Sequence, residues 1–229
     1  HPYARPSDGT PESLASVTPD DLKELHRRLF ARSNISVAVV GAIDAETLAA
    51  ELDRVFGGLP EEAELSPVAQ IQPKLDQQVD YAYALPQSTI QLVYPGIERD
   101  DPEFFGAFIM NHILGGGAFS SRLFNEVRER RGLTYGIGSG LMNSDFSNSL
   151  FIGTSTRSDR VQEALSVIRD EVRRMAEEGP TEEELAKAKT YLIGAYPINN
   201  LDSSTAVANT LVELQKQERG IDYIDRRVG

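Results

Sequence analysis

Residues 119–138 read FSSRLFNEVRERRGLTYGIG, and this stretch predicts a helix followed directly by a strand. Apolar residues recur at helical spacing in its first part: Leu123, Phe124 and Val127. We therefore expect a helix over 120–131 that ends at Gly132, because glycine readily adopts the left-handed conformation of a helix end. After this glycine the residues alternate in character, which predicts a strand over 133–142.

The same stretch concentrates positive charge in an acidic chain. It holds four arginines and two glutamates, so its net charge is +2, whereas the 229-residue chain has a formal charge of −12. Two interpretations of Arg128 and Tyr135 stay open from spacing alone. Either Arg128 stabilises the helix end, where cations are favoured, and Tyr135 shares a core face with Ile137. Or the guanidinium and the phenol converge on an acceptor such as a peptide carbonyl.

Further helices and strands are expected on both sides of this stretch. The other predicted strands are 34–41, 79–85, 90–94 and 148–156. The other predicted helices begin at Thr18, Asp44, Pro102, Asp159, Thr181 and Ser203. The helix that begins at Pro102 is expected to stop at the three consecutive glycines 115–117.

The composition excludes several classes of function. Nucleic-acid binding needs a basic face, which this acidic chain lacks, and no apolar run approaches the ~18–20 residues that span a bilayer. The chain has no cysteine, so it has no disulfides, thiolate metal sites or cysteine nucleophiles. Its histidines, His1, His26 and His112, are too far apart for a helical zinc pair. We therefore expect no metal ligand and no catalytic residue in this chain.

Short motifs are spread over nearly the whole chain in a characteristic order. They are HPYARP at 1–6, SVAVVG at 36–41, ILGG at 113–116, SSRLF at 120–124, EVRE at 126–129 and GLTY at 132–135. In order and spacing, these motifs resemble the pitrilysin/insulinase family of zinc metallopeptidases. The first two are similar to the end of the first half of those proteins, and the others are similar to the second half.

The resemblance implies an α+β fold, in which a mixed, mainly antiparallel sheet has helices packed on one face. In this family two homologous halves enclose a chamber. The first half usually binds zinc through H-x-x-E-H and a downstream Glu. The second half has usually lost those ligands and supplies an Arg and a Tyr, seven residues apart, that hold the substrate backbone. Arg128 and Tyr135 match that pair, so the resemblance favours a substrate-binding role for both.

This chain contains no H-x-x-E-H motif. The resemblance therefore implies a non-catalytic portion that binds peptide substrate and closes the chamber, with zinc in the missing half or in a homologous partner subunit. The chain alone is not expected to hydrolyse peptides. A structural role, as in the core subunits of respiratory complexes, and a stand-alone peptide-binding module both stay open. Bacterial relatives of this type are often exported, which favours the periplasm over the cytoplasm.

The resemblance also implies a domain division. Residues 1–60 correspond to the tail of the first half, 61–75 to a linker, and 76–229 to an inactive second half that is truncated at its C-terminus. A strand at Ile35–Val40 would leave apolar faces and a sheet edge unpaired. We therefore expect residues 18–60 to complete the sheet of the second half, either within one chain or by segment exchange in a homodimer.

Overall fold

The computed structural model describes residues 1–220 and 222–224, which form two compact units. One unit comprises residues 69–192. The other comprises residues 1–68 together with the described residues from 193 onwards.

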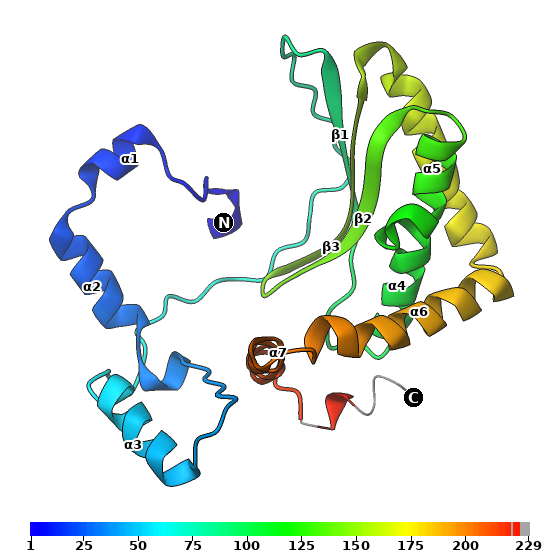
Figure 1. The fold of residues 1–229 in the computed structure, drawn as a ribbon. Coiled ribbons are helices and arrows are strands. Elements are labelled where there is room, and N and C mark those ends of the chain that lie inside the picture. Colours follow the sequence, from blue (N-terminus) through cyan, green and yellow to red (C-terminus); the bar gives the residue numbers. More distant parts are fainter. Residues whose placement is uncertain (221, 225–229) are drawn as a thin grey trace. The chain divides into compact units, whose positions relative to one another are not determined.

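The unit of residues 69–192 is built on an antiparallel sheet with the strand order β1-β3-β2 (Figure 1). The strands are β1 (Gln87–Pro95), β2 (Thr134–Ser144) and β3 (Ser147–Arg157). They confirm the strands predicted at 90–94, 133–142 and 148–156, with ends that differ by one to three residues. β3 lies in the centre and pairs with both neighbours, so its apolar residues are buried most completely.

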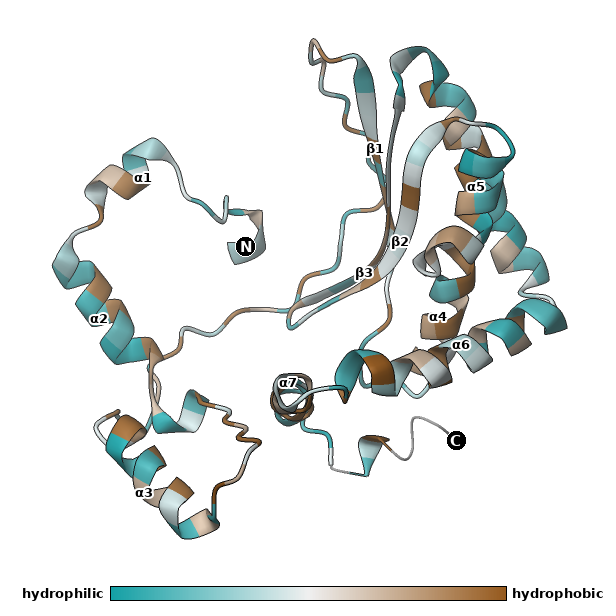
Figure 2. Cartoon of the chain, viewed as in Figure 1, coloured by the Kyte–Doolittle hydropathy of each residue, from teal (hydrophilic) through white to brown (hydrophobic). Residues whose placement is uncertain are grey.

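Helical segments cover one face of this sheet (Figure 1). They are α4 (Phe104–Asn111), the π-helical η3 (His112–Gly116), the short η4 (Ala118–Ser120), the π-helical η5 (Phe124–Glu129), the short η6 (Ser158–Arg160), α5 (Val161–Glu178) and the start of α6 (Glu182–Asn200). Most of α4 is hydrophobic, whereas α5 alternates apolar and polar residues, as expected for a helix with one buried face (Figure 2). The fully buried core side chains include Leu114, Leu123, Val127, Ile152 and Ile168. The expected α+β fold is confirmed.

The glycines after α4 do more than end a helix. The helix stops at these glycines as predicted, and its last part, η3, is π-helical and ends at Gly116. A Cβ atom on Gly115 would lie 2.8 Å from the backbone nitrogen of Ser139 in β2. Only glycine therefore allows η3 to approach the sheet this closely.

The second unit is made of helices joined by extended chain. Its elements are η1 (Pro2–Ala4), α1 (Pro11–Ser16), α2 (Pro19–Leu29), η2 (Arg32–Asn34), α3 (Ala45–Phe56) and α7 (Ser204–Lys216). The predicted caps of α2 and α3 are confirmed, because Thr18 accepts from the N–H of Asp21 and Asp44 accepts from the N–H of Thr47. The Gln215 side chain in α7 donates to the carbonyl of Val37 at 3.0 Å.

Two predicted strands are wrong. Residues 35–40 and 79–85 are in neither a helix nor a strand and form no sheet in the described part of the chain, and Asn34 ends the short helix η2. Val39, Tyr81 and Tyr83 are exposed, although their alternation suits a pleated surface. A strand exists only where a neighbour accepts its backbone hydrogen bonds, and local sequence does not reveal that neighbour. The completion of the sheet by residues 18–60 and the boundaries at 60 and 75 stay predictions.

Candidate functional site

A tight turn at Gly132 joins the segment that carries Arg128 to the strand that carries Tyr135. Gly132 has a φ of +61°, which glycine adopts without steric cost. Its N–H donates to the Arg128 carbonyl at 2.8 Å, and the N–H of Leu133 donates to the Val127 carbonyl at 2.9 Å. The predicted helix end is confirmed. These two hydrogen bonds fix the turn between the backbone of Arg128 and the strand that carries Tyr135.

Arg128 lies in the π-helical segment η5. The wider turn is visible where the N–H of Arg130 donates to the carbonyl of Asn125, five residues earlier, at 2.9 Å. The Arg128 guanidinium carbon lies 4.6 Å from the centre of the Phe124 ring, and one of its nitrogens lies 2.7 Å from the exposed carboxylate of Glu129. The Arg128 side chain is 36% exposed, so guanidinium donors remain available to a further acceptor. π-Helical turns are rare and are frequent at functional sites.

The other three arginines of this block are bound to carboxylates of the core and its edge. Arg130 and Arg131 both contact the buried Glu126 at 2.6 Å. Arg122 is 8% exposed and binds Glu184 through two nitrogens, at 2.7 and 2.6 Å. This guanidinium lowers the pKa of Glu184 from 4.5 to about 2. These three side chains therefore stabilise the fold.

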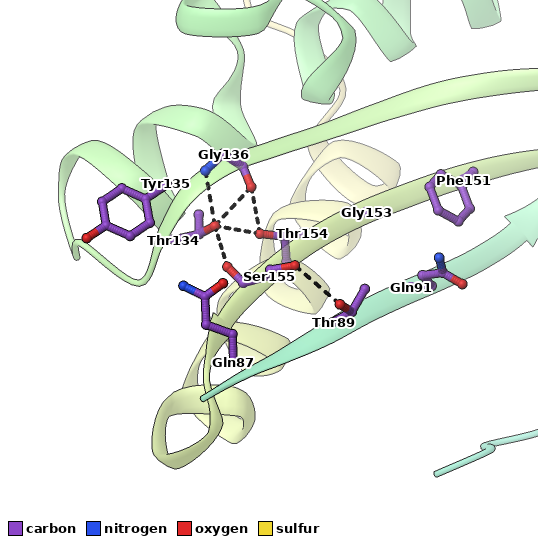
Figure 3. A pocket seen from close by; sticks show the side chains of 10 residues that line it. All are labelled: Gln87, Thr89, Gln91, Thr134, Tyr135, Gly136, Phe151, Gly153, Thr154 and Ser155. Carbon is purple, nitrogen blue, oxygen red and sulfur yellow. Dashed lines mark hydrogen bonds between the residues drawn. The ribbon is translucent and has the colours of Figure 1, made fainter. Parts of the chain in front are cut away.

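Tyr135 is 88% exposed because a β-bulge interrupts β2. The pairing with β3 shifts between Thr134 and Ile137. The hydroxyls of Thr134 and Thr154 lie 2.7 Å apart, and Thr154 donates to the Gly136 carbonyl at 2.8 Å (Figure 3). The interpretation of Tyr135 as a core-face residue is wrong, because the bulge turns its ring outwards while Ile137 stays buried. A glycine at 136 within a strand pattern is a known signal for such a bulge.

A groove of about 360 Å³ lies beside Tyr135 on the sheet face opposite the helices. Ten residues of the three strands line it: Gln87, Thr89, Gln91, Thr134, Tyr135, Gly136, Phe151, Gly153, Thr154 and Ser155 (Figure 3). Arg128 is not among these lining residues. The groove was missed in the sequence, since polar residues alternating with Ile90 and Leu92 are typical of any half-buried strand.

The described residues do not fit a zinc site. In that part of the chain, no three His, Asp or Glu side chains come together in a group that could hold a metal ion. His112 instead stacks on Tyr191, with ring centres 5.1 Å apart, and burial lowers its pKa. No described helix has the length and hydropathy of a membrane span.

The comparisons with known proteins agree with this fold and this chemistry. The profile of a family described as "Peptidase M16 inactive domain" matches residues 16–192. An uncharacterized zinc protease of Streptomyces coelicolor is 28% identical over 219 residues, which are 90% of this chain and 46% of that protein. A protein of Helicobacter pylori named a non-peptidase homolog is 26% identical over 214 residues, with 91% of this chain and 48% of that protein covered.

A solved structure has a similar fold. The crystal structure of a peptidase M16 inactive domain from Pseudomonas fluorescens has a TM-score of 0.85 and 29% identity, and the match covers 100% of this chain and 54% of that one. Fold and site thus define an α+β domain of the peptidase type whose described residues do not fit zinc. The chain belongs to the peptidase M16 family and matches its inactive domain, which confirms the resemblance to the pitrilysin/insulinase peptidases. It spans about half the length of the relatives it matches.

Proposed function

We propose that this chain is the non-catalytic half of a zinc-dependent peptidase and that Arg128 and Tyr135 hold the backbone of its peptide substrate. The observation that carries the proposal is that Tyr135 is exposed and that Arg128 pairs with the exposed carboxylate of its neighbour Glu129, whereas the other three arginines of the block bind the less exposed Glu126 and Glu184. A guanidinium presents paired N–H donors and a phenol presents one O–H donor, and both suit a peptide carbonyl.

The hydrolytic chemistry then belongs to another half or subunit. Zinc there would activate a water molecule for attack on the peptide bond, while this half would orient the substrate and close the chamber. Two observations support this division of roles. The described residues do not fit zinc, and a relative about twice as long as the match is named a zinc protease.

Peptide binding by the 229-residue chain tests the proposal. A fluorescently labelled, unstructured peptide of about ten residues should show saturable anisotropy. We expect Arg128→Ala and Tyr135→Phe each to weaken binding about tenfold, because each removes a hydrogen bond that involves a charged or desolvated group. Arg173→Ala and Tyr191→Phe are the matched controls, and both should bind as the unsubstituted chain does. Unchanged affinity in both Arg128→Ala and Tyr135→Phe would overturn the assignment.

A second function is a scaffold or peptide-binding module without any peptidase partner. It is favoured by the relative from Helicobacter pylori, which is named a non-peptidase homolog. Zinc-dependent hydrolysis of peptides by the full-length gene product, alone or with a homologous subunit, separates the two. Retained peptide binding with no hydrolysis in either setting would favour the module.

A further inference from the structure

The groove on the open sheet face has a defined arrangement of side chains. Every second residue of β1 points towards it: Gln87, Thr89 and Gln91. On β3, Gly153 pairs with Gln91 and Ser155 pairs with Thr89. Within this unit, helices cover the other face of the sheet, and the groove lies on the face that they leave uncovered (Figure 1).

Phe151 and Gly153 shape one end of the groove. A Cβ atom on Gly153 would lie 2.8 Å from one ring carbon of Phe151 and 3.2 Å from the next. The ring therefore lies over β3 in the space that any larger residue at 153 would fill. This arrangement gives the groove a low apolar surface at this end, formed by the Phe151 ring.

Hydrogen-bonding side chains line the β1 side of the groove, with Gln87 towards Tyr135 and Gln91 towards Phe151 (Figure 3). The hydroxyls of Thr134 and Thr154 already bind one another and the Gly136 carbonyl. In contrast, the carboxamides of Gln87 and Gln91 have no hydrogen-bond partner among the residues that the structure describes. The two are four positions apart on one strand, about 13 Å, which an extended peptide of four or five residues spans. Each carboxamide offers a donor and an acceptor, as a peptide group does.

The groove is electrically neutral in a chain of charge −12. None of its ten lining residues is Asp, Glu, Lys, Arg or His. An ionised ligand side chain would lose hydration here without gaining an opposite charge. The volume of about 360 Å³ is near the lower end of the ~300–1,000 Å³ of ligand pockets, which suits a short segment of peptide.

We propose that this groove binds an extended substrate segment, in which Gln87 and Gln91 pair with backbone amides and Phe151 contacts an uncharged, apolar side chain. Gly153 sets the size of that side chain by keeping the Phe151 ring low. This inference rests on the proposed function, because it extends the peptide path from Arg128 and Tyr135 across the sheet. The groove would add a preference for an apolar substrate side chain, whereas Arg128 and Tyr135 would contact only the substrate backbone.

Binding of the 229-residue chain to a peptide set tests this inference. The labelled peptides are alanine- and serine-based decamers that differ at one central position, which is Leu, Lys or Glu. We expect the Leu peptide to bind about tenfold more tightly than the Lys and Glu peptides, because only Leu is desolvated without loss of charge hydration. Phe151→Ala should reduce this preference below about twofold by removing the apolar contact. Gly153→Ala should lift the ring and weaken the Leu peptide more than a peptide with Ala at that position.

A second pair of variants tests the carboxamides. The double substitution Gln87→Ala/Gln91→Ala should weaken all three peptides about tenfold and equally, since it removes backbone contacts. Gln162→Ala, on the exposed side of α5, is the matched control and should change nothing. Thermal unfolding of each variant establishes that the fold is retained, and sedimentation with unlabelled chain shows whether a second copy covers the face.

The outcomes separate this inference from the proposed function. If the Arg128 and Tyr135 variants weaken binding while the groove variants leave affinity and preference unchanged, the groove assignment is overturned and the pair stands. If no peptide binds, both fail. A dimer that is lost on Phe151→Ala, with peptide affinity unaffected, would assign the face to a second copy and likewise reject the groove as a peptide site.

Discussion

The guanidinium of Arg122 and the carboxylate of Glu184 form a bidentate ion pair that joins the residues before η5 to the first turn of α6. The same carboxylate also accepts from the N–H of Thr181 at 2.8 Å, so the predicted capping box is confirmed and is coupled to a tertiary contact. One side chain therefore caps a helix and fixes where that helix packs. Glu184 is 31% exposed, so this contact lies at the edge of the core.

Removal of Arg122 should destabilise the unit of residues 69–192. We expect Arg122→Ala to lower the free energy of unfolding by about 2–3 kcal/mol, less than the ~3–5 kcal/mol of a fully buried pair, because Glu184 keeps solvent and Thr181 as partners. Urea denaturation followed by circular dichroism measures the change. Arg173→Ala breaks an exposed ion pair with Asp170 and should cost less than about 0.5 kcal/mol. Equal effects of the two substitutions would contradict the structural role of Arg122.

The same pair gives the stability a defined pH dependence. The folded-state pKa of Glu184 is about 2 and its ordinary value is 4.5, so the ion pair contributes fully above pH 4.5 and is lost as the pH falls towards 2. The shift corresponds to about 3 kcal/mol at most, and screening at the partly exposed carboxylate reduces this to roughly 2 kcal/mol. Unfolding free energies measured between pH 2 and 6 should fall less steeply for Glu184→Gln. An unchanged slope in that variant would reject the assigned pKa.

Substitution of Gly132 in the turn should destabilise the protein, whereas substitution of a glycine within a helix, Gly106, should stabilise it. Gly132→Ala places a Cβ at a φ of +61° and should cost about 1–2 kcal/mol. Gly106 lies in α4, where a Cβ would meet nothing within 4 Å, so Gly106→Ala should stabilise by about 0.5–1 kcal/mol. Thermal melts of both variants measure the two opposite shifts. A loss of stability in Gly106→Ala would show that the exposed backbone there serves another contact.

The isolated chain should neither retain zinc nor hydrolyse peptides. After dialysis against micromolar zinc and removal of free metal, mass spectrometry of the metal content should give well below one zinc per chain. A quenched fluorescent peptide should stay intact over hours. One equivalent of bound zinc together with chelator-sensitive cleavage would contradict both the metal-free assignment and the proposed division between halves.

Helix ends were predictable because their determinants are local. Two helix starts depend on side chains that accept a hydrogen bond from an N–H group three residues later, those of Thr18 and Asp44. One helix end depends on Gly132, whose N–H donates to a carbonyl four residues earlier. Such short-range contacts can be predicted from the sequence, and all three were located correctly. The segments at 34–41 and 79–85 carry the right alternation, but strand formation depends on a neighbour that the local pattern does not specify.

The candidate site was predictable only in part. The resemblance to the pitrilysin/insulinase peptidases marked Arg128 and Tyr135 as a pair, whereas the bulge that exposes Tyr135 depends on the register of β2 against β3. The groove forms only when three strands pair side by side. For example, Gln91 and Gly153 become neighbours through strand pairing although they are 62 positions apart in the sequence. Single alternating strands gave no sign of it.

The π-helical turn at η5 makes the direction of Arg128 a matter of chain length. A π-helical turn holds one residue more than an α-helical turn within nearly the same rotation about the axis. Deleting that residue would restore the α-helical pitch and leave the flanking parts of the chain almost unrotated, while the side chains inside the turn, Arg128 among them, would change direction. Related chains can therefore differ by one residue here and keep the surrounding fold, so alignments should allow a gap at this place.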